Sequence, residues 1–193
     1  LMELFLLGVG NYTEADVEAS TAAWTGHTDQ WDDELAPYRW RADWHDATPK
    51  DFLGQRINTD AATGAWPGQG PETISVMLGS GVVPSGATNA ANRGRPTRDV
   101  AAEFLSRKLW TSFATDSAPP SSVLSAMRTA LTTTGFSIRP WVTAMLTHSD
   151  FYTDSVKSGL VRTPVEYVVA LMVATGKRSR EANVTWLMEA MGQ

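Results

Sequence analysis

Cysteine is absent from this 193-residue chain. Its absence excludes disulfide bonds, thiolate metal sites and a cysteine nucleophile, but it does not assign a compartment. Long apolar runs are also missing. The longest, residues 167–174, is far shorter than the roughly 20 residues that cross a bilayer, so we predict no membrane span. Sequence patterns of phosphate loops, dinucleotide-binding folds and zinc-binding helices are not found either.

Positive charge is scarce at the start of the chain. Residues 1–60 carry twelve acidic and four basic side chains, whereas residues 61–193 carry nine acidic and twelve basic ones. Because phosphates repel carboxylates, the acidic first third argues against docking of nucleic acid there. We therefore predict no nucleic-acid partner and interpret the acidic region mainly as a solvated face.

Helix signals run through most of the sequence. Thr13 to Asp16 forms a capping-box-like start, and Thr163 to Glu166 forms a full capping box with Pro164 at the first helical position. Apolar residues recur at helical spacing over 123–131 and 138–146, and Thr97 is expected to cap another helix. These patterns predict a mainly α fold, a compact multi-helix domain with at most a small β-hairpin near residues 37–57.

The domain organisation follows from composition. Residues 1–193 are interpreted as a single helical domain, and residues 79–96, rich in Gly, Asn and Ser, as an insertion or mobile loop. An uncapped helix at Leu1 and an abrupt end at Gln193 predict that the sequence is a fragment of a longer chain.

Residues 24–54 concentrate the reactive residue types, with two of the three histidines and four of the eight tryptophans. His45, Asp46 and Lys50 are candidate catalytic residues because an imidazole beside carboxylates can act as a base or a metal ligand. Glu3, a lone charge in an apolar helix, is the candidate fourth member. The alternative is structural: His45 and Asp46 bond a loop, and Lys50 pairs with an acid.

Three further groups of side chains are candidates for binding. Arg93, Arg95 and Arg98 stand at a helix start and could hold an anion. Trp31 and Trp40 could form an aromatic surface, whereas Trp24 and Trp110 are expected in the core. The acids between 29 and 34 lack the regular spacing of a calcium loop, so we interpret them as a solvated loop. The metal and the cofactor are left open.

The sequence resembles a bacterial family, the domain-of-unknown-function family 1800. The resemblance rests on a Leu-Gly turn, a Tyr-Thr-Glu-x-Asp-Val helix start and a Thr-Gly ending, which stand here at residues 7–8, 12–17 and 25–26. His45-Asp46, Lys50 and the Leu53-Gly54 pair fit a later block of the same family. His27 stands where the family usually has tryptophan, and residues 95–98 depart from its His-Pro-x-Thr-Ala pattern.

The resemblance implies a cellular location and a partner protein, but it does not imply a reaction. It implies further chain before Leu1 and after Gln193, an extracytoplasmic location, and a sulfatase-like partner protein encoded nearby. Two functions then compete. The first is an exported hydrolase-type enzyme acting on a polymer or sugar-like substrate. The second is a non-catalytic helical scaffold that binds a partner protein or glycan through an aromatic and acidic surface. An enzyme should bring His45, Asp46 and Glu3 into one cleft, whereas a scaffold leaves them apart with local partners.

Overall fold

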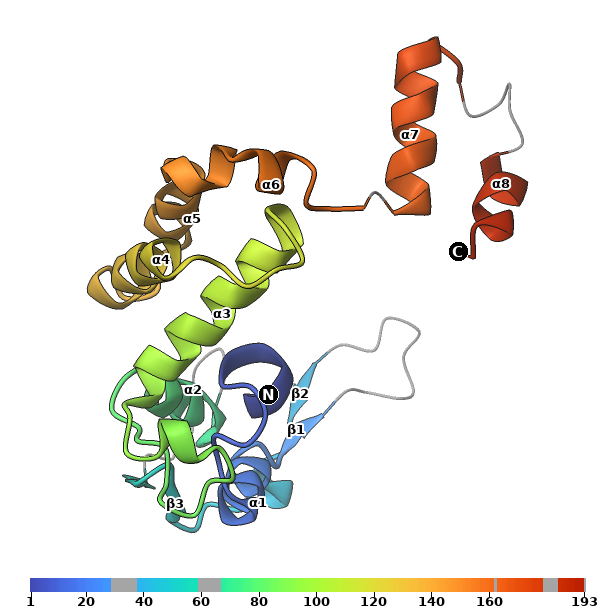
Figure 1. Cartoon of the computed structure of the whole chain (residues 1–193). Helices are drawn as coiled ribbons and strands as arrows, with labels where there is room; N and C mark the ends of the chain where they lie inside the picture. The colour runs from blue at the N-terminus through green and yellow to red at the C-terminus, as the bar shows by residue number, and fades with distance from the viewer. Residues whose placement is uncertain (29–37, 59–66, 162, 179–183, 193) are drawn as a thin grey trace.

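The computed structural model describes residues 1–28, 38–58, 67–161, 163–178 and 184–192. Among these residues it is mainly α with two small antiparallel sheets, which confirms the predicted fold class. The helices are, in chain order, η1 (Met2–Leu6), α1 (Glu14–Ala23), η2 (Ala42–Trp44), α2 (Gly70–Leu78), η3 (Ala90–Asn92), α3 (Thr97–Phe113), α4 (Ser121–Thr133), α5 (Ile138–Leu146), η4 (Ser149–Tyr152), α6 (Asp154–Lys157), α7 (Pro164–Thr175) and α8 (Val184–Ala190). The strands are β1 (His27–Thr28), β2 (Arg39–Trp40), β3 (Lys50–Phe52) and β4 (Gln55–Ile57). Figure 1 shows their arrangement.

The predicted start of α1 is confirmed, and it also anchors a hairpin. Thr13 and Asp16 form the reciprocal capping box, in which the Asp16 carboxylate accepts from the Thr13 backbone at 2.7 Å. The second carboxylate oxygen accepts from the backbone N–H of Leu53 at 2.7 Å. Leu53 has a φ of 47° in the turn between β3 and β4, a region that non-glycine residues rarely adopt. Asp16 therefore fixes the helix start and the hairpin turn together.

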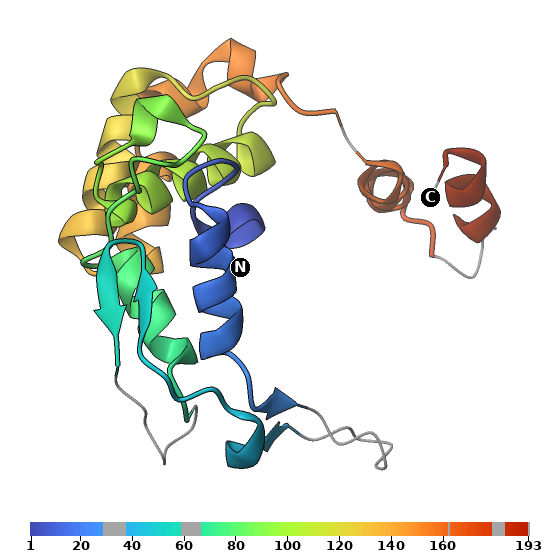
Figure 2. The same cartoon turned by 90° about the horizontal axis from the view of Figure 1, so that it is seen from below.

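The first core lies where this hairpin meets α1 and α2, which lie side by side in Figure 2. Phe52 of β3 and Ile57 of β4 point inward and are fully buried, together with Leu53 in the turn and with Met77 of α2. The period of two in a strand places these residues on one face. The hairpin thus packs against both α1 and α2.

α3 connects this half of the molecule to a second core. Its residue Trp110 is 1% exposed and packs with Met127 of α4 and Met145 of α5, as expected for a core tryptophan. The expectation that Thr97 caps α3 is wrong, because Pro96 occupies that position. Thr97 instead lies buried in the first turn, and its hydroxyl donates to the carbonyl oxygen of Val76 at 3.3 Å.

Residues 79–96 connect α2 to α3 and contact the first half of the chain. The Val82 N–H donates to the Leu53 carbonyl at 2.9 Å, and the Asn89 N–H donates to the Gly10 carbonyl at 2.8 Å. Val83 is buried in a small cluster with Val100. Whether the segment is an insertion relative to the family stays a prediction.

The C-terminal helices α7 and α8 stand apart from the rest of the molecule in both views (Figures 1 and 2). The predicted capping box at Thr163 and Glu166 and the helix stop at Gly176, which has a φ of 67°, are confirmed. Within the described residues, no helix combines the length and apolar character that crossing a bilayer requires.

Candidate functional site

Five rings gather just beyond the C-terminal end of α1 and form a histidine–aromatic cluster (Trp24, His27, Tyr38, Trp40 and His45). The His27 ring centroid lies 5.0 Å from that of Trp24 and 5.0 Å from that of Trp40. The ring centroids of Trp40 and His45 are 4.9 Å apart, and the Tyr38 hydroxyl lies 3.1 Å from Nδ1 of His27. These spacings are those of packed rings, so the two histidines are parts of one aromatic cluster.

Local backbone structure brings the rings together. The antiparallel pairing of β1 with β2 sets His27 opposite Trp40. A Cβ atom at Gly26 would lie 2.8 Å from Cζ3 of Trp40, and one at Gly68 would lie 2.6 Å from Cη2 of the same ring. Both glycines have positive φ, so close approach and backbone conformation both require glycine here.

The orientation of His45 is fixed by Thr25, which follows the C-cap residue of α1. Its Nδ1 lies 2.9 Å from the carbonyl oxygen of Thr25, which can only accept, so Nδ1 carries the proton. The Thr25 hydroxyl in turn accepts from the backbone N–H of Asp46 at 2.8 Å. In the neutral ring this tautomer makes Nε2 the basic nitrogen.

Lys50 and Asp46 are near His45 in the sequence, but their side chains form hydrogen bonds that support the loop between residues 46 and 50. Lys50 is 7% exposed, and its Nζ donates to the carbonyl oxygens of Asp46 and Thr48 and to Oε1 of Gln69, at 2.6, 2.7 and 2.8 Å. The Asp46 carboxylate accepts from the Thr48 backbone and hydroxyl, at 2.9 and 2.6 Å. These hydrogen bonds hold the pKa of the exposed Asp46 below its usual range, and Lys50 lowers it further. We call the Lys50–Gln69 arrangement the lysine lock.

Glu3 is not brought to this cluster. It is exposed and accepts a hydrogen bond from the Tyr12 hydroxyl at 3.0 Å. Tyr12 precedes α1, whereas His45 bonds to Thr25 after it, and the 10-residue helix between them is about 15 Å long. The structure thus brings together His45, Asp46 and Lys50 and leaves Glu3 near the opposite end of α1. A catalytic role for these residues stays a prediction.

The three candidate anion-binding arginines reach different partners. Arg93 donates to the Ala87 carbonyl at 2.7 Å, within its own loop. Arg95 donates to Glu103 at 3.0 Å, and Arg98 donates to the Thr132 carbonyl at the end of α4 at 2.7 Å. An anion site shared by all three stays a prediction.

The aromatic residues differ from expectation in their exposure. Trp31 and the acids of 29–34 lie outside the described residues. Trp40 is half-buried within the histidine–aromatic cluster, whereas Trp44 is 58% exposed and Tyr38 is 45% exposed. The Arg41 guanidinium lies 4.3 Å from the Trp44 ring centroid, in a cation–π contact. Tyr38 and Trp44 were not among the residues predicted for the aromatic surface, although the pair Arg41 and Trp44 three residues apart was a signal for such a contact.

Among the described residues, the site offers no set of side chains suited to binding a metal ion. Within the part of the chain that the structure describes, no three His, Asp or Glu side chains gather in a way that could hold a metal ion. His27 and His45 supply two imidazoles near one another, and their neighbours are mainly aromatic rings.

The titration of His27 leads to a testable pH dependence. Burial lowers its pKa below the ordinary value of 6.5, the charge of His45 lowers it further, and a hydrogen bond to the Pro67 backbone opposes both. As pH falls below 6.5, the unfolded chain binds a proton before the folded one does. We expect the free energy of unfolding to fall with decreasing pH until the folded-state pKa is reached.

Chemical denaturation of the wild type and of His27→Phe between pH 7.5 and 5 measures this effect. The variant keeps a flat ring but cannot titrate, so its pH dependence should be shallower over this window. Identical pH slopes for the two proteins would show that His27 does not contribute.

These features define a helical domain with a histidine–aromatic cluster at one end of its first long helix. The family described as "Protein of unknown function (DUF1800)" matches residues 1–193, and the chain belongs to that family. A search of curated proteins finds no match, and neither does a search of solved structures.

Proposed function

We propose that this chain is a glycan-binding domain whose binding face is the aromatic surface (Tyr38, Arg41 and Trp44) beside the histidine–aromatic cluster. The observation that carries the proposal is the exposure of Trp44 under the Arg41 guanidinium. Large exposed aromatic side chains are costly in water and are enriched at binding sites. A tryptophan face packs against the C–H face of a sugar ring, while neighbouring polar groups bond its hydroxyls.

Local hydrogen bonding favours binding over catalysis. Lys50 has three acceptors in the lysine lock, whereas Asp46 accepts from Thr48 through Oδ1 and its side chain is 45% exposed. A reactive lysine needs an open side facing the substrate, whereas Lys50 is buried and supports a loop. That loop carries His45 and follows Trp44, so its rigidity supports a preformed aromatic surface.

Replacing Trp44 with alanine should weaken glycan binding about tenfold, because stacking on an exposed aromatic ring contributes roughly 1–2 kcal/mol. The test begins with a pull-down on a panel of insoluble polysaccharides and continues with the Kd for the retained polymer. Trp186→Ala is the matched control, since Trp186 is 64% exposed but lies on α8. Equal affinities for wild type and Trp44→Ala would reject the aromatic surface as the binding face.

A hydrolase acting on a polymer or sugar-like substrate is the second candidate. It is favoured by one observation, the hydrogen bond from Nδ1 of His45 to Thr25, which leaves Nε2 as the basic nitrogen. A histidine held in this way can act as a general base toward water. His45→Ala, compared with His148→Ala, tests this candidate through the release of new polymer ends.

The cellular setting is part of the same proposal. The family resemblance supports a bacterial, extracytoplasmic protein with a sulfatase-like partner protein encoded nearby. A glycan-binding domain fits that setting because extracellular polymers are then within reach. Detection of the protein in a periplasmic or culture fraction tests the location.

A further inference from the structure

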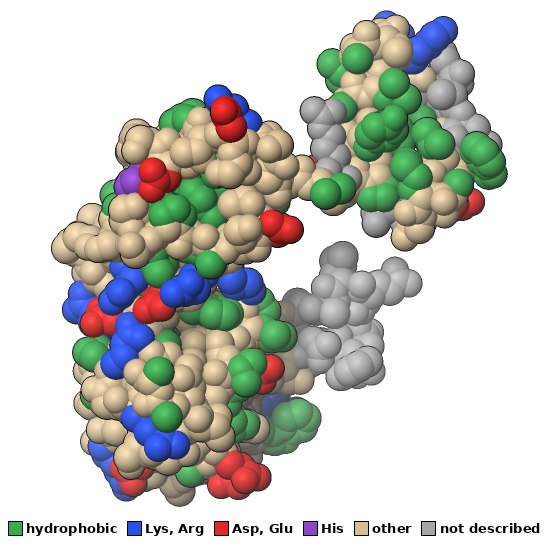
Figure 3. All heavy atoms as spheres, viewed as in Figure 1, with side chains coloured by type: hydrophobic (Ala, Val, Ile, Leu, Met, Phe, Trp, Pro, Cys, Tyr) green, Lys and Arg blue, Asp and Glu red, His purple; other side chains and the backbone are tan. Residues whose placement is uncertain are grey.

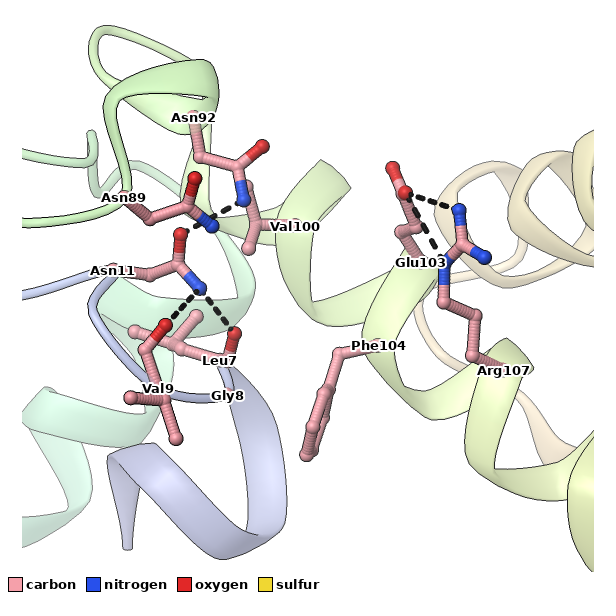
Figure 4. Close-up of a pocket in the computed structure, with 10 residues that line it drawn as sticks. All are labelled: Leu7, Gly8, Val9, Asn11, Asn89, Asn92, Val100, Glu103, Phe104 and Arg107. Carbon is pink, nitrogen blue, oxygen red and sulfur yellow. Dashed lines mark hydrogen bonds and ion pairs between the residues drawn. The ribbon is translucent and has the colours of Figure 1, made fainter. Parts of the chain in front are cut away.

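A separate pocket lies near the start of α1, away from the aromatic surface (Figure 4). It is a cavity of about 290 Å³ between the turn at residues 7–11, residues 89–92 and α3. Its wall contains the side-chain amides of Asn11, Asn89 and Asn92, the charged pair Glu103 and Arg107, and the ring of Phe104. This volume is close to the lower end of the range of small-molecule sites.

The pocket wall is held in place by the protein's own hydrogen bonds. Asn11 is 4% exposed, and its amide nitrogen donates to the Leu7 carbonyl at 2.8 Å. Its amide oxygen accepts from Asn92 at 2.8 Å, and Asn92 accepts from Arg95, which also bonds Glu103. This continuous chain ties the turn, the 89–92 segment and α3 into one rigid rim.

Two polar groups at the pocket retain hydrogen-bonding capacity. The side-chain amide of Asn89 has no hydrogen bond to any of the described residues, and Figure 4 shows it beside the cavity. Arg107 uses Nε and Nη2 on Glu103, at 3.4 and 3.0 Å, which leaves Nη1 for another acceptor. The amide offers both donors and an acceptor, and the guanidinium offers donors only.

The charged side chains that line the pocket are Glu103 and Arg107, and two further guanidinium groups lie beside Glu103, although the whole chain carries a net charge of −5. Three guanidinium groups surround the single carboxylate of Glu103: Arg95 at 3.0 Å, Arg107 at 3.0 Å and Arg128 at 3.7 Å. Burial raises the pKa of Glu103, but the hydrogen bonds from Arg95 and Arg107 outweigh it and hold the pKa below its usual range. Figure 3 shows Lys and Arg side chains, with Asp and Glu among them, across the middle of the molecular face in that view. The surplus charge favours an anionic ligand.

Phe104 adds a flat apolar wall. A Cβ atom at Gly8 would lie 2.9 Å from Cδ2 of the ring, so the glycine turn lies directly against it. The Lys108 ammonium lies 5.2 Å from the ring centroid on α3. An aromatic wall beside planar amide and guanidinium groups suits a ligand with an apolar C–H face and a rim of hydroxyls.

We propose that this pocket binds an acidic monosaccharide, a uronate unit. Its carboxylate bonds Arg107, its hydroxyls bond the Asn89 amide, and its C–H face packs on Phe104. A guanidinium recognises a carboxylate through charge-assisted hydrogen bonds, which are about twice as strong as neutral ones. The inference rests on this pocket alone and does not depend on the aromatic surface.

Calorimetric titration of the full chain with glucuronate and galacturonate, and with glucose as the neutral comparison, tests the site. At least one uronate should bind saturably and glucose should bind at least about tenfold more weakly, because glucose lacks the carboxylate. Arg107→Gln should weaken uronate binding roughly tenfold, and Asn89→Ala should weaken it about fivefold through loss of the amide contacts. Arg56→Gln is the control, since Arg56 is an exposed arginine paired with Asp51 on the hairpin.

Three results would overturn the proposal: no saturable binding of either uronate, equal affinity for glucose, or unchanged affinity in Asn89→Ala and Arg107→Gln. Circular dichroism of each variant confirms that it is folded. Trp44→Ala should leave uronate binding at this pocket intact, so loss of binding in that variant alone would assign the uronate to the aromatic surface instead. The failure of one proposal is therefore distinguishable from the failure of the other.

Discussion

Replacing Lys50 with methionine is expected to lower the free energy of unfolding by about 3–5 kcal/mol. The ammonium group is almost fully buried, and it donates to two backbone carbonyls and to the side chain of Gln69. Methionine fills a similar volume but removes the charged donor from the Asp46 carbonyl and from Gln69 Oε1, and it leaves the Thr48 carbonyl with only the Gln69 amide at 3.3 Å. A buried acceptor that loses its partner costs about 1–3 kcal/mol, and more where the lost donor was charged.

Denaturant unfolding of the wild type and Lys50→Met measures the loss, with Lys157→Met as the control. Lys157 also pairs with a carboxylate, Asp154 at 2.9 Å, but its side chain is 65% exposed, so its removal should cost less than about 1 kcal/mol. Similar losses in both variants would contradict the lysine lock. So would a Lys50→Met protein of wild-type stability.

Asp16→Ala is expected to lower the free energy of unfolding by about 2–4 kcal/mol. The carboxylate closes the capping box of α1 and accepts the N–H of Leu53, so its loss affects a helix start and a hairpin turn together. The Leu53 N–H would be left buried without an acceptor, at a residue that already has an unfavourable φ of 47°.

Glu14→Ala provides the comparison for Asp16. Glu14 lies in the same first turn of α1 but is exposed, so its removal should cost no more than about 0.5 kcal/mol through the helix dipole. Hydrogen exchange separates the two roles of Asp16: the Leu53 amide should exchange much faster in Asp16→Ala and at an unchanged rate in Glu14→Ala. Unchanged Leu53 exchange in Asp16→Ala would show that the carboxylate does not hold the hairpin.

Local signals in the sequence predicted most of the helical fold. The capping boxes at residues 13–16 and 163–166 and the glycine stop at 176 depend on neighbouring residues, and all three are present. Thr97 failed as a cap because Pro96 takes the N-cap position, which places Thr97 inside the first turn of α3. The small hairpin predicted near residues 37–57 is present as β3 and β4, which pair across the turn at Leu53-Gly54.

The candidate site was less predictable because its contacts join distant parts of the chain. Within residues 24–54, the Lys50 Nζ lies 3.7 Å from Oδ1 of Asp46, and the catalytic role proposed for the two residues stays a prediction. No local pattern could show that Lys50 bonds Gln69, or that Trp24 donates its indole N–H to Thr73 at 3.0 Å. Glu3 was a candidate on the assumption that a lone charge in an apolar segment is buried, but the short η1 leaves it exposed.

The exposure of the aromatic side chains also could not be predicted from the local sequence pattern. Strands of two residues, such as β1 and β2, are too short for a pattern of alternation to separate buried from exposed rings. Trp40 is half-buried because the glycine backbone at 26 and 68 passes against it, whereas Trp44 follows in a single 3₁₀ turn and stays exposed. His27 packs as a flat ring between Trp24 and Trp40.

The most direct test of the proposed function is to follow polymer length while the protein is bound. The polysaccharide retained in the pull-down is incubated with the protein and sampled by size-exclusion chromatography. A glycan-binding domain predicts that the polymer binds and that its length distribution stays unchanged with time. Progressive shortening by the wild type that is lost in His45→Ala would contradict this account and identify the chain as a hydrolase.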